Sequence, residues 1–441
     1  MGRFRTILIP LICTTIVLLL SSWDVQSVNS ELMPPVKEEL SQDVNLSAGC
    51  GSVYPSCSGK RLTPAPHKKK PFAIINYGRH GSCYLGKPSD YDAPYKVLLS
   101  ADSVGKLTSL GRDVLNRLKL IRDDAHNHWG ELTDIGICQM QEIVSRMEER
   151  FPEIFNKDAF RIEALSLRNT RSMLSMEYTM NHVSKTTRIR VYRNASQAFS
   201  DFLDHQEESR LAVRGDSAAQ AAYDAFASKH SAGNRLAQSL FSDADYVRAH
   251  VNVTTLSDQL FKIAGNLQNT ALAGRFTLYD LFSGDEIYHH WKKQNAWWYF
   301  NYGGYVHHAE KKEALQHRLL RHLFALADTA IKTKPTARFR FADETSFIPF
   351  VCLLGVNGYG LATNDLESLD GKGWIDYRLC PMGANLQFVL YRKNPEDKDV
   401  LMQVLLNDEE ATLPLPTDVA PYYHLSDFYS YYQKILEPYD K

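Results

Sequence analysis

The sequence predicts an α/β protein with a central, mostly parallel sheet flanked by helices and an inserted, mainly helical cap domain. Strand-like and helical segments alternate towards both ends of the chain, which is the pattern of an α/β layer. In the middle, helical periodicity dominates, as in "DSAAQAAYDAFASKHSAGNRLAQSLF". We therefore expect a signal peptide at 1–27, an N-terminal arm at 28–70, an α/β domain at 71–204 and 331–441, and the helical cap at 205–330.

The composition is that of an ordinary globular protein and excludes a broad basic surface. Of the 441 residues, 44% are hydrophobic and 23% are charged. The formal net charge is −1, so no overall positive field recruits nucleic acid. An anion-binding site in this chain must therefore be a local cluster of cations.

The first residues have the pattern of a secretory signal. Arg3 and Arg5 precede the apolar run "ILIPLICTTIVLLL", which is short for a membrane span and leads to a plausible cleavage site near Val25 and Ser27. The alternative is an uncleaved anchor. The signal interpretation predicts a secreted or periplasmic protein with no stable membrane span after cleavage.

Export permits disulfides. One of the 7 cysteines, Cys13, lies in the apolar run, which leaves an even number in the mature chain. The segment "CGSVYPSC" predicts a bridge between Cys50 and Cys57, because a short Gly/Pro/Ser loop can bring its ends together. The sequence does not specify the pairing of the others, which are Cys83, Cys138, Cys352 and Cys380.

The N-terminal part of the α/β domain begins with a strand at 71–77, "PFAIINY". Apolar residues at helical spacing then predict a helix within 100–128, and Thr133 is the expected N-cap of a second helix. Alternation of apolar and polar residues predicts strands at 161–167 and 188–193, on either side of the helical "RNTRSMLSMEYTMNHV".

Strand character returns after the helical middle, in "ARFRFAD", "NLQFVLYRK" and "VLMQVLLND". Within the middle, His289 and His290 are expected on an exposed helix face. Trp297, Trp298 and Tyr299 are expected in the core, where aromatic side chains are found more often than in a ligand platform.

The first candidate for chemistry is the triplet Arg79-His80-Gly81. A histidine at the carboxyl end of a strand lies where open α/β sheets place ligands. The neighbouring arginine offers a planar set of donors to phosphate, and the glycine lets backbone amides approach an anion. A neutral imidazole placed in this way can attack phosphorus and form a phosphohistidine. The other interpretation of the triplet is a polar surface turn.

Two further clusters can complete such a site. Arg168 and Arg171 lie between a strand and a helix, where the helix N-terminus favours anions, or else on a solvated helix face. Asp343 and Glu344 follow a strand and precede the apolar "FIPFVCLLGV". They can supply a carboxylic acid that protonates a leaving group, although a role as N-cap also explains Asp343.

Together, these segments resemble the second branch of the histidine phosphatase superfamily, the histidine acid phosphatases and phytases. Within it the chain is most similar to the multiple inositol polyphosphate phosphatases in their bacterial, Bacteroides-like form. The matching stretches follow the family's order over nearly the whole mature chain. They are "YPSCSGKRLTPAP", "YGRHGSCYL", "GELTDIG", "RNTRSMLSM", "FTLYDLF", "QNAWWYFNYG", "CPMGANLQFVLYRK" and "VLLNDEEATLPL".

The resemblance assigns roles to individual residues. His80 matches the family's nucleophile, Arg79 matches its first phosphate-binding arginine, and Arg171 matches the arginine supplied by the helix after the second strand. Glu344 falls on the aspartate of the family's His-Asp version and would protonate the leaving oxygen. The candidate catalytic residues are thus His80, Glu344 and Asp343, and the candidate phosphate-binding residues are Arg79, Arg171 and Arg168.

The chain departs from the family at two positions, and both changes make the pocket less cationic. Cys83 stands where the family has a further arginine, and Asp343 where it has a histidine. A like charge about 4 Å from a phosphate repels it by roughly 4 kcal/mol at an effective dielectric constant near 20. Three compensations remain open: protonation of Asp343 beside Glu344, occupation of the Cys83 position by Arg168, or a cation bound by His80 and both carboxylates.

The resemblance therefore implies an exported phosphomonoesterase that needs no metal and no other cofactor. Its partner would be a small-molecule phosphate ester, an inositol polyphosphate, and not a nucleic acid. The alternative hypothesis is a catalytically impaired relative that acts as a binding or scaffold protein, because the two replaced residues both belong to the phosphate pocket.

Overall fold

The structure is a computed structural model, and it describes residues 35–56, 59–155, 161–187, 189–203, 216–231, 233–306, 309–332 and 336–437. The segment predicted as a signal peptide lies outside these residues, as does Cys57. Export therefore stays a prediction.

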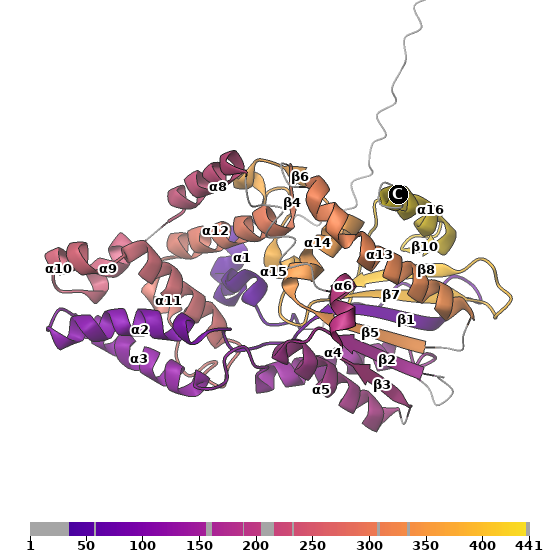
Figure 1. Cartoon of the computed structure of the whole chain (residues 1–441), viewed down its shortest axis with the longest axis horizontal. Helices are drawn as coiled ribbons and strands as arrows, with labels where there is room; N and C mark the ends of the chain where they lie inside the picture. The colour runs from indigo at the N-terminus through magenta and orange to yellow at the C-terminus, as the bar shows by residue number, and fades with distance from the viewer. Residues whose placement is uncertain are drawn as a thin grey trace, which may run out of the picture. The chain divides into compact units, whose positions relative to one another are not determined.

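A central sheet of eight strands organises the fold (Figure 1). Its order is β10-β8-β7-β1-β5-β2-β3, with β9 beside β8. Four strands, β1, β5, β2 and β3, pair in parallel, and the others are added antiparallel. The predicted α/β fold class is confirmed. The bounds are β1 Lys70–Arg79, β2 Arg161–Ser166, β3 Val191–Asn194, β5 Thr336–Ala342, β7 Asn385–Arg392, β8 Leu401–Leu406, β9 Glu409–Glu410 and β10 Tyr422–His424.

The register of the parallel strands brings distant parts of the sequence to one edge of the sheet. Arg79 at the end of β1 pairs with Ala342 at the end of β5, and Ser166 at the end of β2 pairs with Phe341. The residues that follow these strands therefore emerge side by side. This is the edge where α/β sheets place their ligands.

Helices cover both faces of the sheet (Figure 1). On one face, α4 (Asp134–Arg150) and α5 (Thr170–Thr186) share a hydrophobic cluster with Ile74 of β1. On the other, α13 (Ala309–Lys332), α14 (Glu344–Leu354) and α16 (Leu425–Leu436) share a cluster with Ile75 of β1. Successive residues of β1 thus point to opposite faces and are buried on both, as in a central strand.

The helical part of the fold lies beside the sheet and has a cluster of its own (Figure 1). It combines α9 (Asn234–Leu240), α10 (Ala244–His250) and α11 (Val253–Leu267) with α2 (Pro88–Ser103) and α3 (Ser109–Ala125). The cluster therefore includes helices from the segment 71–204, whereas α13 from the segment 205–330 packs on the sheet. The hydrophobic clusters do not test the predicted domain boundaries, which stay a prediction.

Local signals explain several helix ends. Thr133 accepts a hydrogen bond from the amide of Gly136 and is the N-cap of α4, as predicted. Asn169 caps α5 in the same way through Ser172. The single helix expected within 100–128 is instead the end of α2 and the whole of α3, because Gly105 between them adopts φ 68°.

The predicted N-terminal arm is folded where the structure describes it. It forms α1 (Val36–Gln42) and the 3₁₀ segment η1 (Val44–Gly51). Val36 and Leu40 pack against Trp291 of α12 (Gly284–Tyr302). Among the described helices, none combines the length and the apolar character that crossing a membrane requires.

Candidate active site

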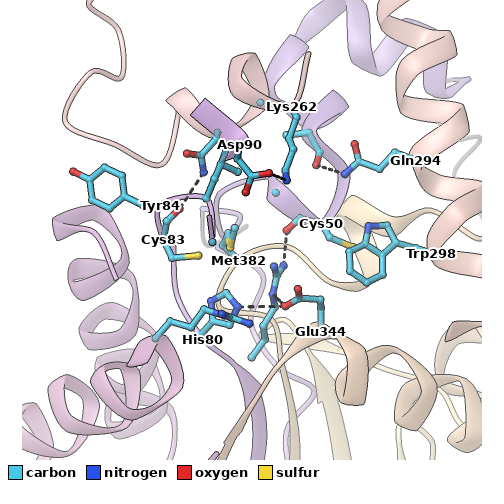
Figure 2. A pocket seen from close by; sticks show the side chains of 18 of the residues that line it. Cys50, His80, Cys83, Tyr84, Asp90, Lys262, Gln294, Trp298, Glu344 and Met382 are labelled. Carbon is cyan, nitrogen blue, oxygen red and sulfur yellow. Dashed lines mark hydrogen bonds and ion pairs between the residues drawn. The ribbon is translucent and has the colours of Figure 1, made fainter. Parts of the chain in front are cut away.

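A cavity of about 510 Å³ opens at the carboxyl ends of β1 and β5 (Figure 2). Arg79, His80, Cys83 and Glu344 line it, and His80 and Glu344 lie side by side at the bottom of the view in Figure 2. Arg171 reaches it from the first turn of α5. Five of the residues that the sequence singled out therefore meet around one space, and the parallel register is what brings them together.

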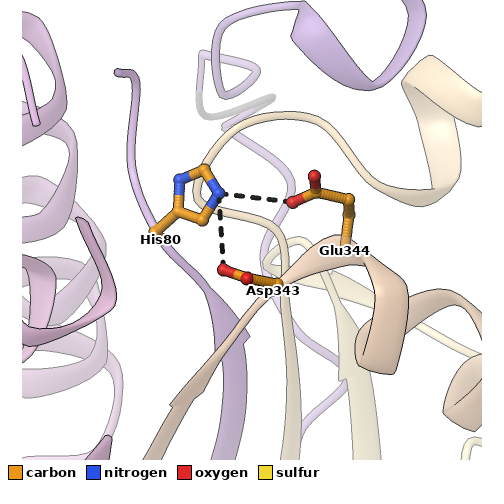
Figure 3. Close-up of side chains that lie close together, drawn as sticks. All are labelled: His80, Asp343 and Glu344. Atoms are coloured by element: carbon orange, nitrogen blue, oxygen red, sulfur yellow. Dashed lines mark hydrogen bonds and ion pairs between the residues drawn. The ribbon is translucent and has the colours of Figure 1, made fainter. Parts of the chain in front are cut away.

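The imidazole of His80 is buried and held in one orientation. Its Nδ1 atom lies 2.8 Å from the carbonyl oxygen of Gly81, and because a carbonyl only accepts, Nδ1 carries the hydrogen. The Nε2 atom points to the two acidic residues of β5 and α14, 3.3 Å from Oε2 of Glu344 and 3.8 Å from Oδ1 of Asp343 (Figure 3). In its neutral form the ring thus presents a lone pair to the cavity.

Gly81 has a steric reason to be glycine. A Cβ atom at this position would lie 2.8 Å from the carbonyl oxygen of Gly136, in the first turn of α4. Helix α4 therefore packs directly against the backbone that follows His80, and the Gly81 amide donates to Ser175 Oγ at 3.1 Å. Close packing on both sides holds the histidine in place.

The guanidinium of Arg79 is buried in a set of acceptors. Its Nε donates to Oε2 of Glu344 at 3.0 Å. Its Nη1 donates to the carbonyl oxygens of Cys50 and Cys380, the latter at 3.0 Å. Burial disfavours the charge, but the facing Glu344 carboxylate and the cysteines around it together outweigh burial, and the pKa of Arg79 is raised.

Asp343 is held by hydrogen bonds from α5. Its Oδ2 accepts from Nη2 of Arg171 at 2.8 Å and from Nδ2 of Asn169 at 3.1 Å, and its Oδ1 accepts from Oγ of Ser172 at 3.3 Å. It stands at the N-cap position of α14, but its side chain makes no capping hydrogen bond. Three donors, one of them cationic, fit an ionised carboxylate, so the charge of Asp343 is compensated by Arg171.

Arg168 does not join this site. Its side chain is exposed, and it is not among the described residues that line the cavity. Arg168 therefore does not replace the cation that the family has at the position of Cys83. Of the two phosphate-binding candidates on this turn, only Arg171 reaches the pocket.

Cys83 and His80 influence each other's charge. Burial raises the pKa of the Cys83 thiol. The charge and hydrogen bond of His80, together with the charges of Arg171 and Arg79, outweigh burial and lower that pKa. Burial likewise opposes protonation of His80, yet Cys83 and Glu344 raise the pKa of His80 to about 9. At neutral pH the free site therefore stores a proton on His80.

Glu344 is ionised in the free site. Burial raises the pKa of its carboxyl, but Arg79 and His80 outweigh this and hold that pKa well below its usual range. The expected proton donor thus lacks its proton at rest, and the proton resides on the histidine 3.3 Å away.

The arrangement favours an anion over a metal ion. His80, Asp343 and Glu344 offer ligand atoms within 4.8 Å of one another, which is a geometry that can hold a metal. Each carboxylate is, however, already paired with a guanidinium, and an additional cation would lie against both. These residues do not fit a resident metal ion.

The upper walls of the cavity are partly aromatic. Trp297, Trp298 and Tyr302 of α12 line it. Lys262 of α11 and Asp90 of α2 form an ion pair at 2.8 Å, which lies across the cavity from His80 in Figure 2. Trp297 is 39% exposed, so the prediction of a core position is wrong for Trp297, whereas Trp298 is half-buried and packs against the hydrophobic core. Tyr299 is fully buried, as predicted.

The prediction of an exposed histidine pair on α12 is wrong, because His290 is buried and His289 is half-buried. His290 is buried against α11, where its ring nitrogens lie 3.0 Å from Ser257 Oγ and 3.2 Å from Asp258 Oδ1. His289 lies with its Nδ1 2.8 Å from Nδ1 of His230. The pair belongs to the packing between helices and does not reach the cavity.

The predicted bridge between Cys50 and Cys57 stays a prediction, because Cys57 lies outside the described residues. Sequence reasoning also missed the part that residues 50 and 380 play around Arg79. The backbone carbonyl oxygens of these two residues accept hydrogen bonds from Arg79. A pattern of side chains in the sequence does not indicate which backbone carbonyls will be acceptors.

Comparison by sequence finds no relative: no family model and no curated protein matches the chain. Solved structures do match. The chain is similar to the multiple inositol polyphosphate phosphatase of Bifidobacterium longum, solved with inositol hexasulfate, with a TM-score of 0.74 and 16% identity over 87% of this chain and 97% of that one. It is also similar to the phytase of D. castellii, with a TM-score of 0.64 and 13% identity over 93% and 90% of the two chains. The chain therefore has the fold that its resemblance to histidine acid phosphatases implied.

Proposed function

We propose that this chain, which has the fold of the histidine acid phosphatases, is an exported phosphomonoesterase that acts through a phosphohistidine at His80, with inositol polyphosphates as its substrate class. The observation that carries the proposal is the orientation of the imidazole. Nδ1 is fixed by Gly81, and Nε2 faces carboxylates that are each held by a guanidinium. The solved phosphatase complexes with inositol hexasulfate and with phosphate support the choice of an anionic ester.

The carboxylates mark where anionic oxygens are accommodated. Glu344 Oε2 lies within hydrogen-bond reach of both Arg79 and His80, which is where a phosphate oxygen would be held. A phosphate dianion is a stronger partner for a guanidinium than one carboxylate oxygen is. Substrate binding would therefore displace Glu344 from Arg79.

Displacement of Glu344 from Arg79 would also allow Glu344 to take the proton of His80. With phosphate on Arg79 and Arg171, the pKa of Glu344 rises, because its cationic neighbours are neutralised. The proton of His80 then passes from Nε2 to Glu344. This single transfer yields a neutral imidazole, which can attack, and a carboxylic acid, which can donate.

The reaction then runs in two steps. Nε2 of His80 attacks phosphorus, the P–O bond to the leaving group breaks, and Glu344 gives its proton to the leaving oxygen. Water next attacks the phosphohistidine, the P–N bond breaks, and the Glu344 carboxylate takes a proton from that water. Arg79 and Arg171 hold the phosphoryl oxygens throughout.

The two departures from the family weaken this site without abolishing it. At about 4 Å and an effective dielectric constant near 20, Asp343 repels the phosphate by roughly 4 kcal/mol. Arg171 is 2.8 Å from the same carboxylate, and its attraction for phosphate is of the same order. The repulsion of phosphate by Asp343 and its attraction by Arg171 thus nearly cancel. Arg79, His80 and the N-terminus of α5 would then supply the net attraction for the phosphate.

The test is a search for the phosphoenzyme. The mature chain is mixed with 4-nitrophenyl phosphate or phytate between about pH 3 and 8, quenched, and analysed for a phosphoryl group that is labile in acid and stable in alkali. His80→Ala should lose it, whereas His126→Ala, an exposed histidine on another loop, should keep it. Absence of turnover and of the phosphoenzyme in the unmodified chain would remove the proposal.

The second candidate function is a binding protein derived from a phosphatase. It is favoured by one observation: both guanidinium groups of the pocket are ion-paired with the chain's own carboxylates. In that case titration calorimetry would detect binding of inositol hexasulfate, while phytate would stay intact under the same conditions.

A further inference from the structure

Two segments that are far apart in the sequence meet around Arg79. Its Nη1 atom donates to the carbonyl oxygens of both Cys50 and Cys380; the dashed line that leaves the Cys50 carbonyl in Figure 2 is one of these bonds. Two oxygens within hydrogen-bond reach of one nitrogen lie at most about 6 Å apart. The backbones of residues 50 and 380 are therefore neighbours.

Other contacts hold the same two segments together. The amide of Met382 donates to the carbonyl oxygen of Ser52 at 2.9 Å. Gly49 adopts φ 56°, and a Cβ atom there would lie 2.2 Å from Oδ2 of Asp376, in the short helix α15 (Asp376–Leu379). The segment from η1 thus runs in close contact with α15 and the turn before β7.

The two thiols complete this contact. Cys50 is 2% and Cys380 is 0% exposed, and burial together with the neighbouring Cys380 thiol raises the pKa of Cys50. Cys138 is exposed and Cys352 is half-buried; both lie outside this contact. The described cysteines therefore include one buried pair whose backbones and side chains both approach each other.

We propose that Cys50 and Cys380 form a disulfide in the mature protein. The two thiols lose two protons and two electrons to a disulfide oxidant, either a protein disulfide or oxidised glutathione. An S–S bond forms between the cysteines, and the oxidant is reduced to two thiols. The inference requires an oxidising compartment, which the predicted signal supplies, and it does not depend on the proposed activity.

The bridge would have two consequences for the molecule. It would join η1 covalently to the turn before β7, and because that closes a very long loop, it would restrict the unfolded chain strongly. It would also fix the two hydrogen-bond acceptors of Arg79 relative to each other, since the carbonyl oxygens of the two bridged residues both accept from Nη1 of Arg79. Arg79 would then be held in place even when Glu344 leaves it.

Peptide mapping without reductant tests the proposal directly. The mature chain is treated with oxidised glutathione, alkylated, unfolded and digested with trypsin. Cleavage after lysine and arginine puts Cys50 and Cys57 in one peptide, 38–60, and Cys380 in another, 379–392. The expected product is these two peptides cross-linked, in the unmodified chain and in Cys57→Ser, but not in Cys50→Ser.

Two results would overturn the proposal. One is alkylated Cys380 in the unmodified, oxidised chain; the other is a bridge confined to peptide 38–60. The unmodified chain serves as the primary sample, so the test holds even where a variant fails to fold. As a second readout, Cys380→Ser should melt about 5 °C or more below the oxidised parent, and Cys352→Ser within about 2 °C of it.

Discussion

Oε2 of Glu344 lies 3.3 Å from Nε2 of His80 and 3.0 Å from Nε of Arg79. One carboxylate oxygen therefore contacts both the candidate nucleophile and its neighbouring cation. In the proposed mechanism, this oxygen stands in the free protein where a phosphate oxygen would bind, and Glu344 would protonate the leaving group once substrate is present. The same side chain would then control both the occupancy of the pocket and the supply of the proton.

Replacing this carboxyl by an amide separates its two roles. In Glu344→Gln we expect kcat on phytate to fall about 100-fold or more, because an alkoxide leaving group needs a proton. Hydrolysis of 4-nitrophenyl phosphate should fall less than about 10-fold, since nitrophenolate leaves without one. Phosphate should inhibit the variant more strongly, because the competing charge is gone. An equal loss on both substrates would contradict the role of Glu344 as the acid.

The turn before α5 offers a matched pair of arginines. Arg171 pairs with Asp343 in the pocket, whereas Arg168 is exposed outside it. Arg171→Ala should lower kcat/KM by about 100-fold or more, through the lost contact to the transferring group and the now uncompensated Asp343. Arg168→Ala should stay within about 2-fold of the parent. Similar losses in the two variants would mean that the turn acts through its general charge.

The sequence located several residues that line the cavity because they follow strand ends, which parallel pairing brings to one edge. His80, Glu344 and Arg171 could be found in this way. The aromatic wall could not, because Trp297 and Trp298 have the same apolar pattern as core residues, and only the position of α12 beside the cavity brings them to its lining. The thiol beside His80 was visible as a departure from the family, but its effect on the charge of His80 depends on three-dimensional contact.

The buried carboxyl of Asp376 should make stability depend on pH. Burial raises the pKa of Asp376 to about 7, although Trp291 Nε1 donates to it at 3.0 Å. Between its ordinary value near 3.8 and about 7, the folded state binds a proton that the unfolded state lacks, so this group's contribution to stability falls as pH rises through that window.

The variant Asp376→Asn removes that dependence. Its melting temperature, measured by calorimetry at several pH values, should exceed that of the parent most above pH about 7 and least near pH about 4. The gain is on the order of 4 kcal/mol at most, from about three pKa units. A gain that is the same at both ends of the range would show that the carboxyl does not change its charge there.

The aromatic wall should bind the leaving group and not the phosphate. Trp297→Ala should raise KM for phytate about 10-fold, the value of one lost aromatic contact, and leave kcat within about 2-fold. Inhibition by inorganic phosphate should stay unchanged. Tyr192→Ala, an exposed aromatic residue on β3, is the control and should change neither constant. A fall in kcat with KM unchanged would place Trp297 in the chemical step instead.

Cys83 should react as a thiolate because of its histidine neighbour. The charge of His80 is the largest of the influences that lower the pKa of Cys83, and the thiol opens onto the cavity. Iodoacetamide at neutral pH should therefore alkylate Cys83 about 10-fold faster in the parent than in His80→Ala, where the pKa of the thiol rises with burial.

Cys138, which is exposed on α4, should react equally in both proteins and serves as the internal standard. Phosphate should slow the reaction at Cys83 alone, because it would bind beside His80 and cover the sulfur. If Cys83 reacts at the same rate in both proteins, the histidine and the thiol do not share a charge, and the imidazole is then neutral at rest and ready to attack without first passing its proton to Glu344.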